Sequence, residues 1–87
     1  MWKIQRTVVG TSSVFRISGR ISERELVELR KILSSELEAR RTILDLKEVE
    51  LVDQETVRFL DQCETEGVTI KNCRPYIRVW ISRMDHD

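Results

Sequence analysis

The feature that most limits what this chain can fold into is a pair of helix-start signals, each preceded by an apolar segment with the pattern of a strand. At the first signal, the Ser22 hydroxyl and the Glu25 carboxylate can each satisfy a backbone N–H group that a first helical turn leaves without a partner. At the second, the Asp53 side chain can cap a helix whose first turn contains Glu55, which complements the positive end of the helix dipole. The chain is therefore predicted to alternate between strands and helices.

The segments around these two helices predict four strands and one more helix. The predicted strands are Trp2–Val9, Val14–Ser18, Arg41–Leu46 and Val68–Ile70. Pro75 is well placed in the first turn of a third helix, and Gly67 is well placed to end the second helix in a left-handed conformation. The resulting order, β-β-α-β-α-β-α, predicts an α/β fold in which helices cover a four-stranded mixed sheet, and a single domain over residues 1–87.

Apolar side chains recur every three or four residues along the predicted helices, which is typical of helices with one buried face. Inward-facing side chains are therefore expected at Leu26, Leu29, Leu33, Leu37, Val57, Leu60 and Cys63, with Phe59 beside them. Cys63 and Cys73 are the only cysteines, and they lack the histidines and further cysteines of a zinc site. Both are predicted to be reduced thiols, and no metal or cofactor is expected.

Composition limits the class of protein. Of the 87 residues, 40% are hydrophobic and 34% are charged, which is ordinary for a globular protein, and no apolar run approaches the length of a membrane span. Basic and acidic residues number 15 each, so there is no net positive field to attract nucleic acid or anionic lipid. The amino end lacks the pattern of a secretory signal, and we expect the protein to be cytoplasmic.

The order of elements resembles that of the STAS domain, which is found in bacterial anti-sigma factor antagonists and in the tails of sulfate transporters. Val14–Ile21 is similar to the family's strand that ends in Gly-Arg before the first helix. Ile43–Leu46 and Leu51–Gln54 match more closely: the family has an apolar-apolar-Asp-Leu strand, a few residues, and then an apolar residue, aspartate and serine at a helix start. The resemblance covers nearly the whole chain and implies a regulatory module that binds proteins and is not an enzyme.

The residue after the second aspartate departs from the family pattern. In the family it is a serine that the partner anti-sigma factor, a protein kinase, phosphorylates to release the complex; here it is Gln54, which cannot accept a phosphoryl group. The usual phosphorylation switch is therefore lost at Gln54. Thr56 is a possible displaced phosphorylation site, although a threonine in a first helical turn more often bonds to the backbone. Either Gln54 stands in for an unphosphorylated serine, or the partner has changed and the segment is only a helix start.

The resemblance implies that a protein partner binds the loop from Lys47 to Val52 together with the start of the second helix, so that the binding segment spans residues 47–58. Its predicted partner-binding residues are Asp53, Gln54, Glu55, Thr56 and Arg58. An anti-sigma factor kinase, a transporter subunit and a signalling complex are all candidate partners. Neither nucleic-acid binding nor membrane insertion is expected.

Three alternatives stay open. The chain could be a nucleotide-binding or phosphotransfer protein, although no phosphate-cradling loop supports that reading. It could also be a structural subunit of a transporter or signalling complex, with a homodimer formed through the exposed edge of Trp2–Val9. Finally, Asp45 and Asp53 could form a carboxylate pair for acid–base chemistry or magnesium, but Asp53 already has a complete explanation as a helix cap.

Overall fold

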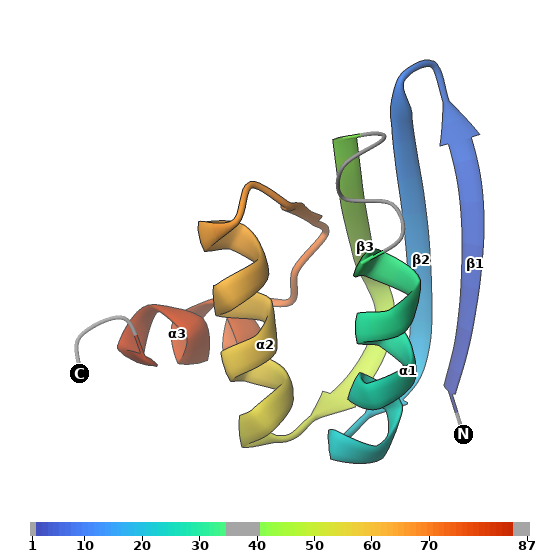
Figure 1. Cartoon of the computed structure of the whole chain (residues 1–87). Coiled ribbons are helices and arrows are strands. Elements are labelled where there is room, and N and C mark those ends of the chain that lie inside the picture. The colour runs from blue at the N-terminus through green and yellow to red at the C-terminus, as the bar shows by residue number, and fades with distance from the viewer. Residues whose placement is uncertain (1, 35–40, 85–87) are drawn as a thin grey trace.

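The structure is a computed structural model that describes residues 2–34 and 41–84. The chain forms β1 (Trp2–Val9), β2 (Ser12–Ile21), α1 (Glu23–Ser34), β3 (Arg41–Val52), α2 (Gln54–Thr65), β4 (Thr69–Lys71) and α3 (Pro75–Met84) (Figure 1). The strands form one sheet in the order β1-β2-β3-β4, in which β1 is antiparallel to β2 and the other pairs are parallel. The predicted order of elements and the mixed four-stranded sheet are confirmed.

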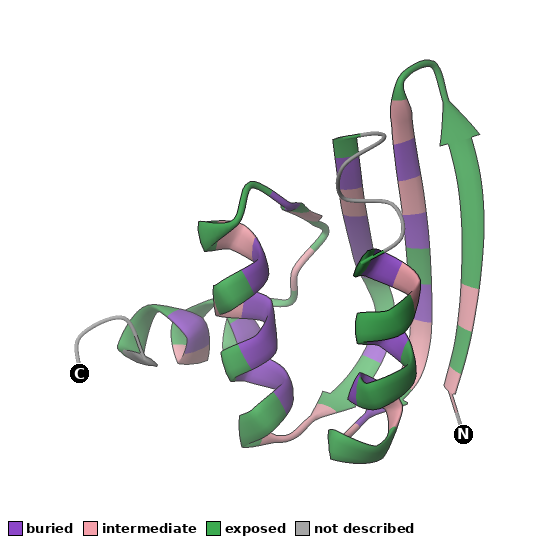
Figure 2. Ribbon diagram, in the orientation of Figure 1, coloured by how far each residue is buried: buried purple, intermediate pink, exposed green. Residues whose placement is uncertain are grey.

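One hydrophobic core lies between the helices and one face of the sheet. Alternate residues of the two central strands point into it, and Phe15, Ile17, Leu44 and Leu46 are all buried. The predicted inward positions on α1 and α2 are buried too, except Leu37, which lies outside the described residues. Figure 2 shows the buried residues on β2, β3 and the helices, while β1 is mostly exposed. The fold therefore leaves β1 as an open edge of the sheet.

The two central strands are longer than predicted, because they pair with each other as far as Ile21 and Val52. The prediction of a loop from Lys47 to Val52 is therefore wrong, because this segment forms the second half of β3. Two register shifts each place one extra β3 residue opposite β2. Such bulges interrupt the alternation of apolar and polar side chains, which is the signal by which a strand is predicted from sequence.

The start of α3 is attached to the second half of β3 by two side-chain hydrogen bonds. The Arg74 Nε donates to the carbonyl oxygen of Val49 at 2.6 Å, and the Tyr76 hydroxyl donates to that of Glu50 at 2.8 Å. Both acceptors lie a few residues before the point where β3 leads into α2. These contacts therefore attach the start of α3 to the part of β3 that leads into α2.

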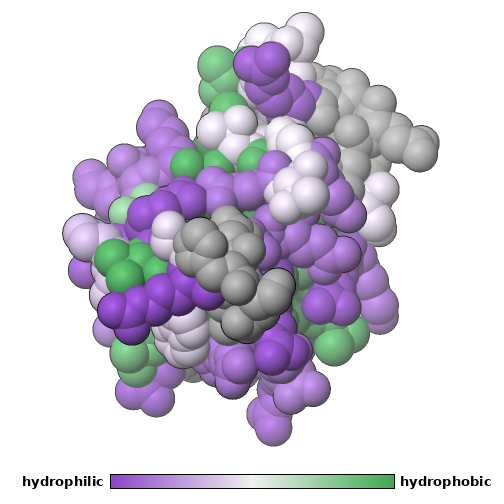
Figure 3. Space-filling view, turned by 90° about the vertical axis from the view of Figure 1, so that its left-hand side faces the viewer, coloured by the Kyte–Doolittle hydropathy of each residue, from purple (hydrophilic) through white to green (hydrophobic). Residues whose placement is uncertain are grey.

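The side of the molecule that carries α3 is largely hydrophilic, with small and separate apolar areas (Figure 3). Tyr76 and Val79 of α3 are about half exposed, at 45% and 51%. In the part of the chain that the structure describes, no helix combines the length and the apolar composition needed to span a membrane.

Candidate functional site

Asp53 caps α2 as the sequence predicts. Its Oδ1 accepts a hydrogen bond from the backbone N–H of Thr56 at 2.9 Å and a second one from the Thr56 hydroxyl at 2.6 Å. The backbone of Asp53 is extended, as is usual for a residue just before a helix. The predicted cap is therefore confirmed.

The same carboxylate also holds the start of α1. Asp53 Oδ2 accepts a hydrogen bond from the backbone N–H of Glu23 at 3.0 Å, so the two helix starts meet at one side chain. At α1 itself, the Glu25 carboxylate accepts from the Ser22 N–H at 3.0 Å, as predicted. The prediction that the Ser22 hydroxyl accepts from a backbone N–H is wrong, because this hydroxyl donates to the Glu25 carboxylate at 2.7 Å and the N–H groups of Glu25 and Leu26 bond to the Ser22 carbonyl oxygen. The link between Asp53 and Glu23 spans 30 residues, and nothing in the local sequence pattern signals it.

These contacts favour the charged form of Asp53. Burial raises the pKa of Asp53, but the hydrogen bonds from Thr56 and from the N–H of Glu23 together lower it by more, so the pKa lies below its ordinary value of 3.8. The carboxylate is therefore ionised at neutral pH and places a negative charge where two helix dipoles present their positive ends.

Thr56 lies inside the protein, with none of its surface exposed. Its hydroxyl donates to the Asp53 carboxylate or to the carbonyl oxygen of Ile21, which lies 3.0 Å away. A kinase reaches a hydroxyl only when it is exposed, so phosphorylation of Thr56 would require the start of α2 to open. The geometry agrees with the alternative interpretation from the sequence, in which Thr56 is a first-turn threonine that forms hydrogen bonds within the protein.

The remaining predicted residues, Gln54, Glu55 and Arg58, are exposed. The Arg58 guanidinium lies 3.6 Å from the Glu55 carboxylate, and both side chains are at least half exposed, so this ion pair adds little stability. Two exposed apolar side chains flank them: Leu51 at the end of β3, and Val27 of α1, which lines a hollow of about 190 Å³ together with Glu55. We call these five residues, Val27, Leu51, Gln54, Glu55 and Arg58, the α2-start surface.

Asp45 and Asp53 do not form a carboxylate pair. The chain between them is almost entirely strand, so they lie up to about 26 Å apart at the usual rise per residue. Asp45 is buried, and its Oδ1 accepts from the Lys47 N–H and from the Asn72 amide, each at 3.0 Å. Across residues 2–34 and 41–84, no three side chains of the His, Cys, Asp or Glu type gather in a way that could hold a metal ion.

Asp45 has its own set of compensating contacts. Burial raises its pKa, but the hydrogen bonds from Asn72 and Lys47 and the charges of Arg16 and Lys71 lower it by more, so the pKa lies below 3.8. Arg16 Nε lies 3.6 Å from Asp45 Oδ2, on the neighbouring strand. These contacts account for the buried carboxylate without any ligand.

The arrangement of elements matches solved structures. The unphosphorylated form of the anti-sigma factor antagonist SpoIIAA superposes with a TM-score of 0.76 and 19% sequence identity, over 95% of this chain and 81% of that one. The chain has the SpoIIAA fold. An uncharacterised protein of the DUF3478 family with a SpoIIAA-like fold, from Shewanella loihica PV-4, superposes with a TM-score of 0.57 and 14% identity, over 98% of this chain and 77% of that one.

No family model and no curated protein matches the sequence. The resemblance to the STAS domain, drawn from Ile43–Leu46 and Leu51–Gln54, is confirmed at the level of the SpoIIAA fold. At 19% identity the likeness to SpoIIAA concerns the fold alone.

Proposed function

We propose that the chain is a non-catalytic regulatory module that binds a protein partner through the α2-start surface. The observation that carries this proposal is the exposure of Gln54, Glu55 and Arg58 on the fold of an anti-sigma factor antagonist, at the helix start where the family pattern has its regulatory serine. Exposed apolar side chains beside charged ones, as at Leu51 and Val27, are the composition that protein interfaces use. SpoIIAA acts against an anti-sigma factor by name, so an anti-sigma factor is the first partner to test.

Binding through this surface would rely on side chains and not on free backbone groups. Asp53 already accepts hydrogen bonds from the N–H groups of Glu23 and Thr56, which are groups that a phosphate would otherwise use at a helix start. This favours a protein partner over a nucleotide at the start of α2.

The proposed module lacks the serine switch of the family. Gln54 carries an amide that cannot be phosphorylated, and the Thr56 hydroxyl is buried and hydrogen-bonded. Incubation with a purified anti-sigma factor kinase and ATP should therefore leave the mass of the protein unchanged. A phosphopeptide that contains Thr56 would contradict this part of the proposal.

The test of the binding surface starts from a partner identified by affinity capture and then purified. Its affinity is measured by calorimetry for the native chain and for the double variant Glu55→Lys/Arg58→Glu. Both changes are at exposed positions, so the variant should fold normally, whereas its affinity should fall by about tenfold or more.

The matched control is Glu28→Lys/Lys31→Glu, which reverses an exposed acidic and basic residue at the same spacing on α1. We expect this control to bind within about twofold of the native chain, because neither side chain belongs to the α2-start surface and, as in the test variant, the net charge is unchanged. Equal affinity for the native chain and for the Glu55/Arg58 variant would refute the assignment of the surface.

A further inference from the structure

A second feature of the molecule adjoins the hollow that Val27 and Glu55 line, and Arg30 lines both. A cavity of about 210 Å³ opens between the second halves of α1 and α2. Its lining residues are Arg30, Leu33, Ser34, Phe59, Gln62, Cys63, Glu66 and Val68. We call it the α1–α2 cavity. It shares no residue with the α2-start surface.

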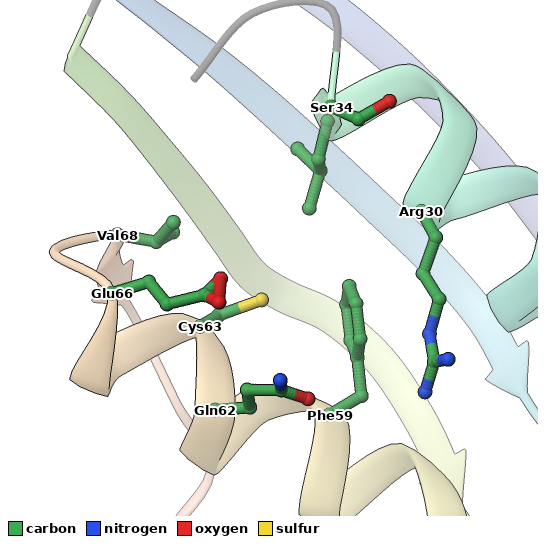
Figure 4. A pocket seen from close by; sticks show the side chains of 8 residues that line it. Arg30, Ser34, Phe59, Gln62, Cys63, Glu66 and Val68 are labelled. Atoms are coloured by element: carbon green, nitrogen blue, oxygen red, sulfur yellow. The ribbon is translucent and has the colours of Figure 1, made fainter. Parts of the chain in front are cut away.

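The floor of the α1–α2 cavity is apolar. Leu33, Phe59 and Val68 are buried residues of the hydrophobic core, and the sulfur of Cys63 points into the space between Phe59 and Glu66 (Figure 4). Burial raises the pKa of the Cys63 thiol to about 12, so the thiol is neutral at physiological pH and behaves as a small apolar group. An apolar cavity of roughly 150 Å³ is enough for benzene, so this one has room for an aromatic ring with a short chain.

The rim of the cavity is polar and carries opposite charges on opposite sides. Figure 4 shows Arg30 on one side and Glu66 on the other. Both charges act on the thiol between them, since Glu66 raises the pKa of Cys63 and Arg30 lowers it. A ligand that bound here with a negative group would be attracted by Arg30 and repelled by Glu66, which fixes its orientation.

Arg30 is also held in position. Its guanidinium carbon lies 5.4 Å from the centroid of the Phe59 ring, a distance at which cation and ring attract each other. This contact uses the charge of Arg30 and not its N–H donors, which are the groups that bind a carboxylate. On its other side Arg30 lines the hollow that also contains Glu23 and Glu55, but it forms no ion pair or hydrogen bond with either of them. The cation therefore lies beside the Phe59 ring with its N–H donors available to an anion.

We propose that the α1–α2 cavity binds a small organic carboxylate, with an apolar or aromatic body over Phe59 and Cys63 and the carboxylate on Arg30. The chemical argument is the combination of an apolar floor, a positioned cation on one rim and an anion on the opposite rim. The Gln62 side-chain amide is a further hydrogen-bonding group in the lining, whereas the Ser34 hydroxyl already donates to the carbonyl oxygen of Lys31 at 3.1 Å.

The probe for this proposal is 4-phenylbutyrate, which has an aromatic ring, a short chain and one carboxylate. It is titrated into the isotopically labelled whole chain, and amide chemical shifts are followed by NMR. We expect saturable shifts at Phe59, Gln62, Cys63 and Val68, with a Kd on the order of 1 mM for a ligand of about twelve non-hydrogen atoms. The matched amine, 4-phenylbutylamine, has the same body and the opposite charge. It should bind at least about fivefold more weakly, because Phe59 holds the Arg30 cation in place, whereas the Glu66 side chain has no hydrogen bond or ion pair within the described residues.

Two variants test the roles of the cation and the floor. Arg30→Glu should reverse the preference between the two probes, whereas Arg24→Glu, the same change at an exposed position of α1 outside the cavity lining, should leave it as it is. Cys63→Met should fill the cavity and abolish the shifts. If Cys63→Met does not fold, the comparison of Arg30→Glu with Arg24→Glu still tests the proposal. No saturable shift with 4-phenylbutyrate, or equal binding of acid and amine, would overturn the proposal.

Discussion

At the scale of single residues, Asp53 has the most demanding role in the structure, since its carboxylate serves the starts of two helices. Replacement by alanine removes the acceptor for the N–H groups of Thr56 and Glu23 and for the Thr56 hydroxyl. Loss of a helix cap and of partly buried hydrogen bonds costs about 1–2 kcal/mol in the free energy of unfolding. Urea unfolding followed by circular dichroism measures the loss.

Asp53→Asn is the control that distinguishes the contribution of Asp53 to the start of α1 from its contribution to the start of α2. An asparagine still caps α2 well when its oxygen takes the place of Oδ1, but its NH₂ group then replaces Oδ2 and cannot accept a hydrogen bond from the N–H of Glu23. We therefore expect Asp53→Asn to lie between the native chain and Asp53→Ala in stability. If Asp53→Asn were as stable as the native chain, the link between α1 and α2 through Asp53 would contribute nothing.

The lowered pKa values of Asp45 and Asp53 make stability depend on pH in a definite direction. A carboxyl whose folded-state pKa lies below its unfolded-state value adds stability that is fully present above the unfolded value and is lost as the pH falls through the folded one. With an ordinary value of 3.8 for both residues, the free energy of unfolding should be nearly flat from about pH 7 to pH 5 and fall below about pH 4.

This pH dependence is measured by urea unfolding at a series of pH values. Asp53→Asn should show a shallower fall below about pH 4 than the native chain, because one of the carboxyls with a lowered pKa is absent. A native stability that rose as the pH was lowered from about 4 to about 3 would contradict the assigned direction of both shifts.

At the scale of elements, Gly67 shows how one residue ends α2 and allows β4 to begin. It has φ +99°, and a Cβ added there would meet nothing within 4 Å, so the cost of a side chain comes from the backbone conformation alone. Gly67→Ala should therefore lower the free energy of unfolding by about 1–2 kcal/mol.

Gly10, in the turn between β1 and β2, provides the comparison. A Cβ added at Gly10 would also meet nothing within 4 Å, but its φ of +60° lies in the left-handed region that other residues can enter at lower cost. Thermal unfolding should place Gly10→Ala closer to the native chain than Gly67→Ala. The reverse order of stability would show that backbone strain does not determine the cost of alanine at these two positions.

The elements also show what a sequence can and cannot predict. The helix starts at Asp53 and Pro75 were predictable because capping residues act on their own neighbours in the chain. The extent of β3 was not, because its second half depends on pairing with β2 across two bulges. Likewise, the hydrogen bond between Asp53 and Glu23 joins distant segments and has no local signature.

At the scale of the whole molecule, one sheet face is covered by helices and β1 forms an open edge, with Val8 and Val9 exposed at 44% and 60%. The order of elements, and with it the SpoIIAA fold, was predictable, because alternating strand and helix signals restrict the topology strongly. The accessibility of the predicted site residues was not: Gln54, Glu55 and Arg58 lie on the surface, whereas Thr56 is buried through contacts with β2. Dimerisation through β1 stays a prediction that light scattering at several concentrations can test.

The central claim is that this fold binds a protein partner through the start of α2. The most direct measurement is an NMR footprint: amide chemical shifts of the labelled chain are compared with and without the purified partner. The account predicts that the largest changes fall on Leu51–Arg58 and on Val27 of α1, with β1 and the outer side of α3 little changed. A footprint confined to β1 or to α3, with the start of α2 unaffected, would contradict it.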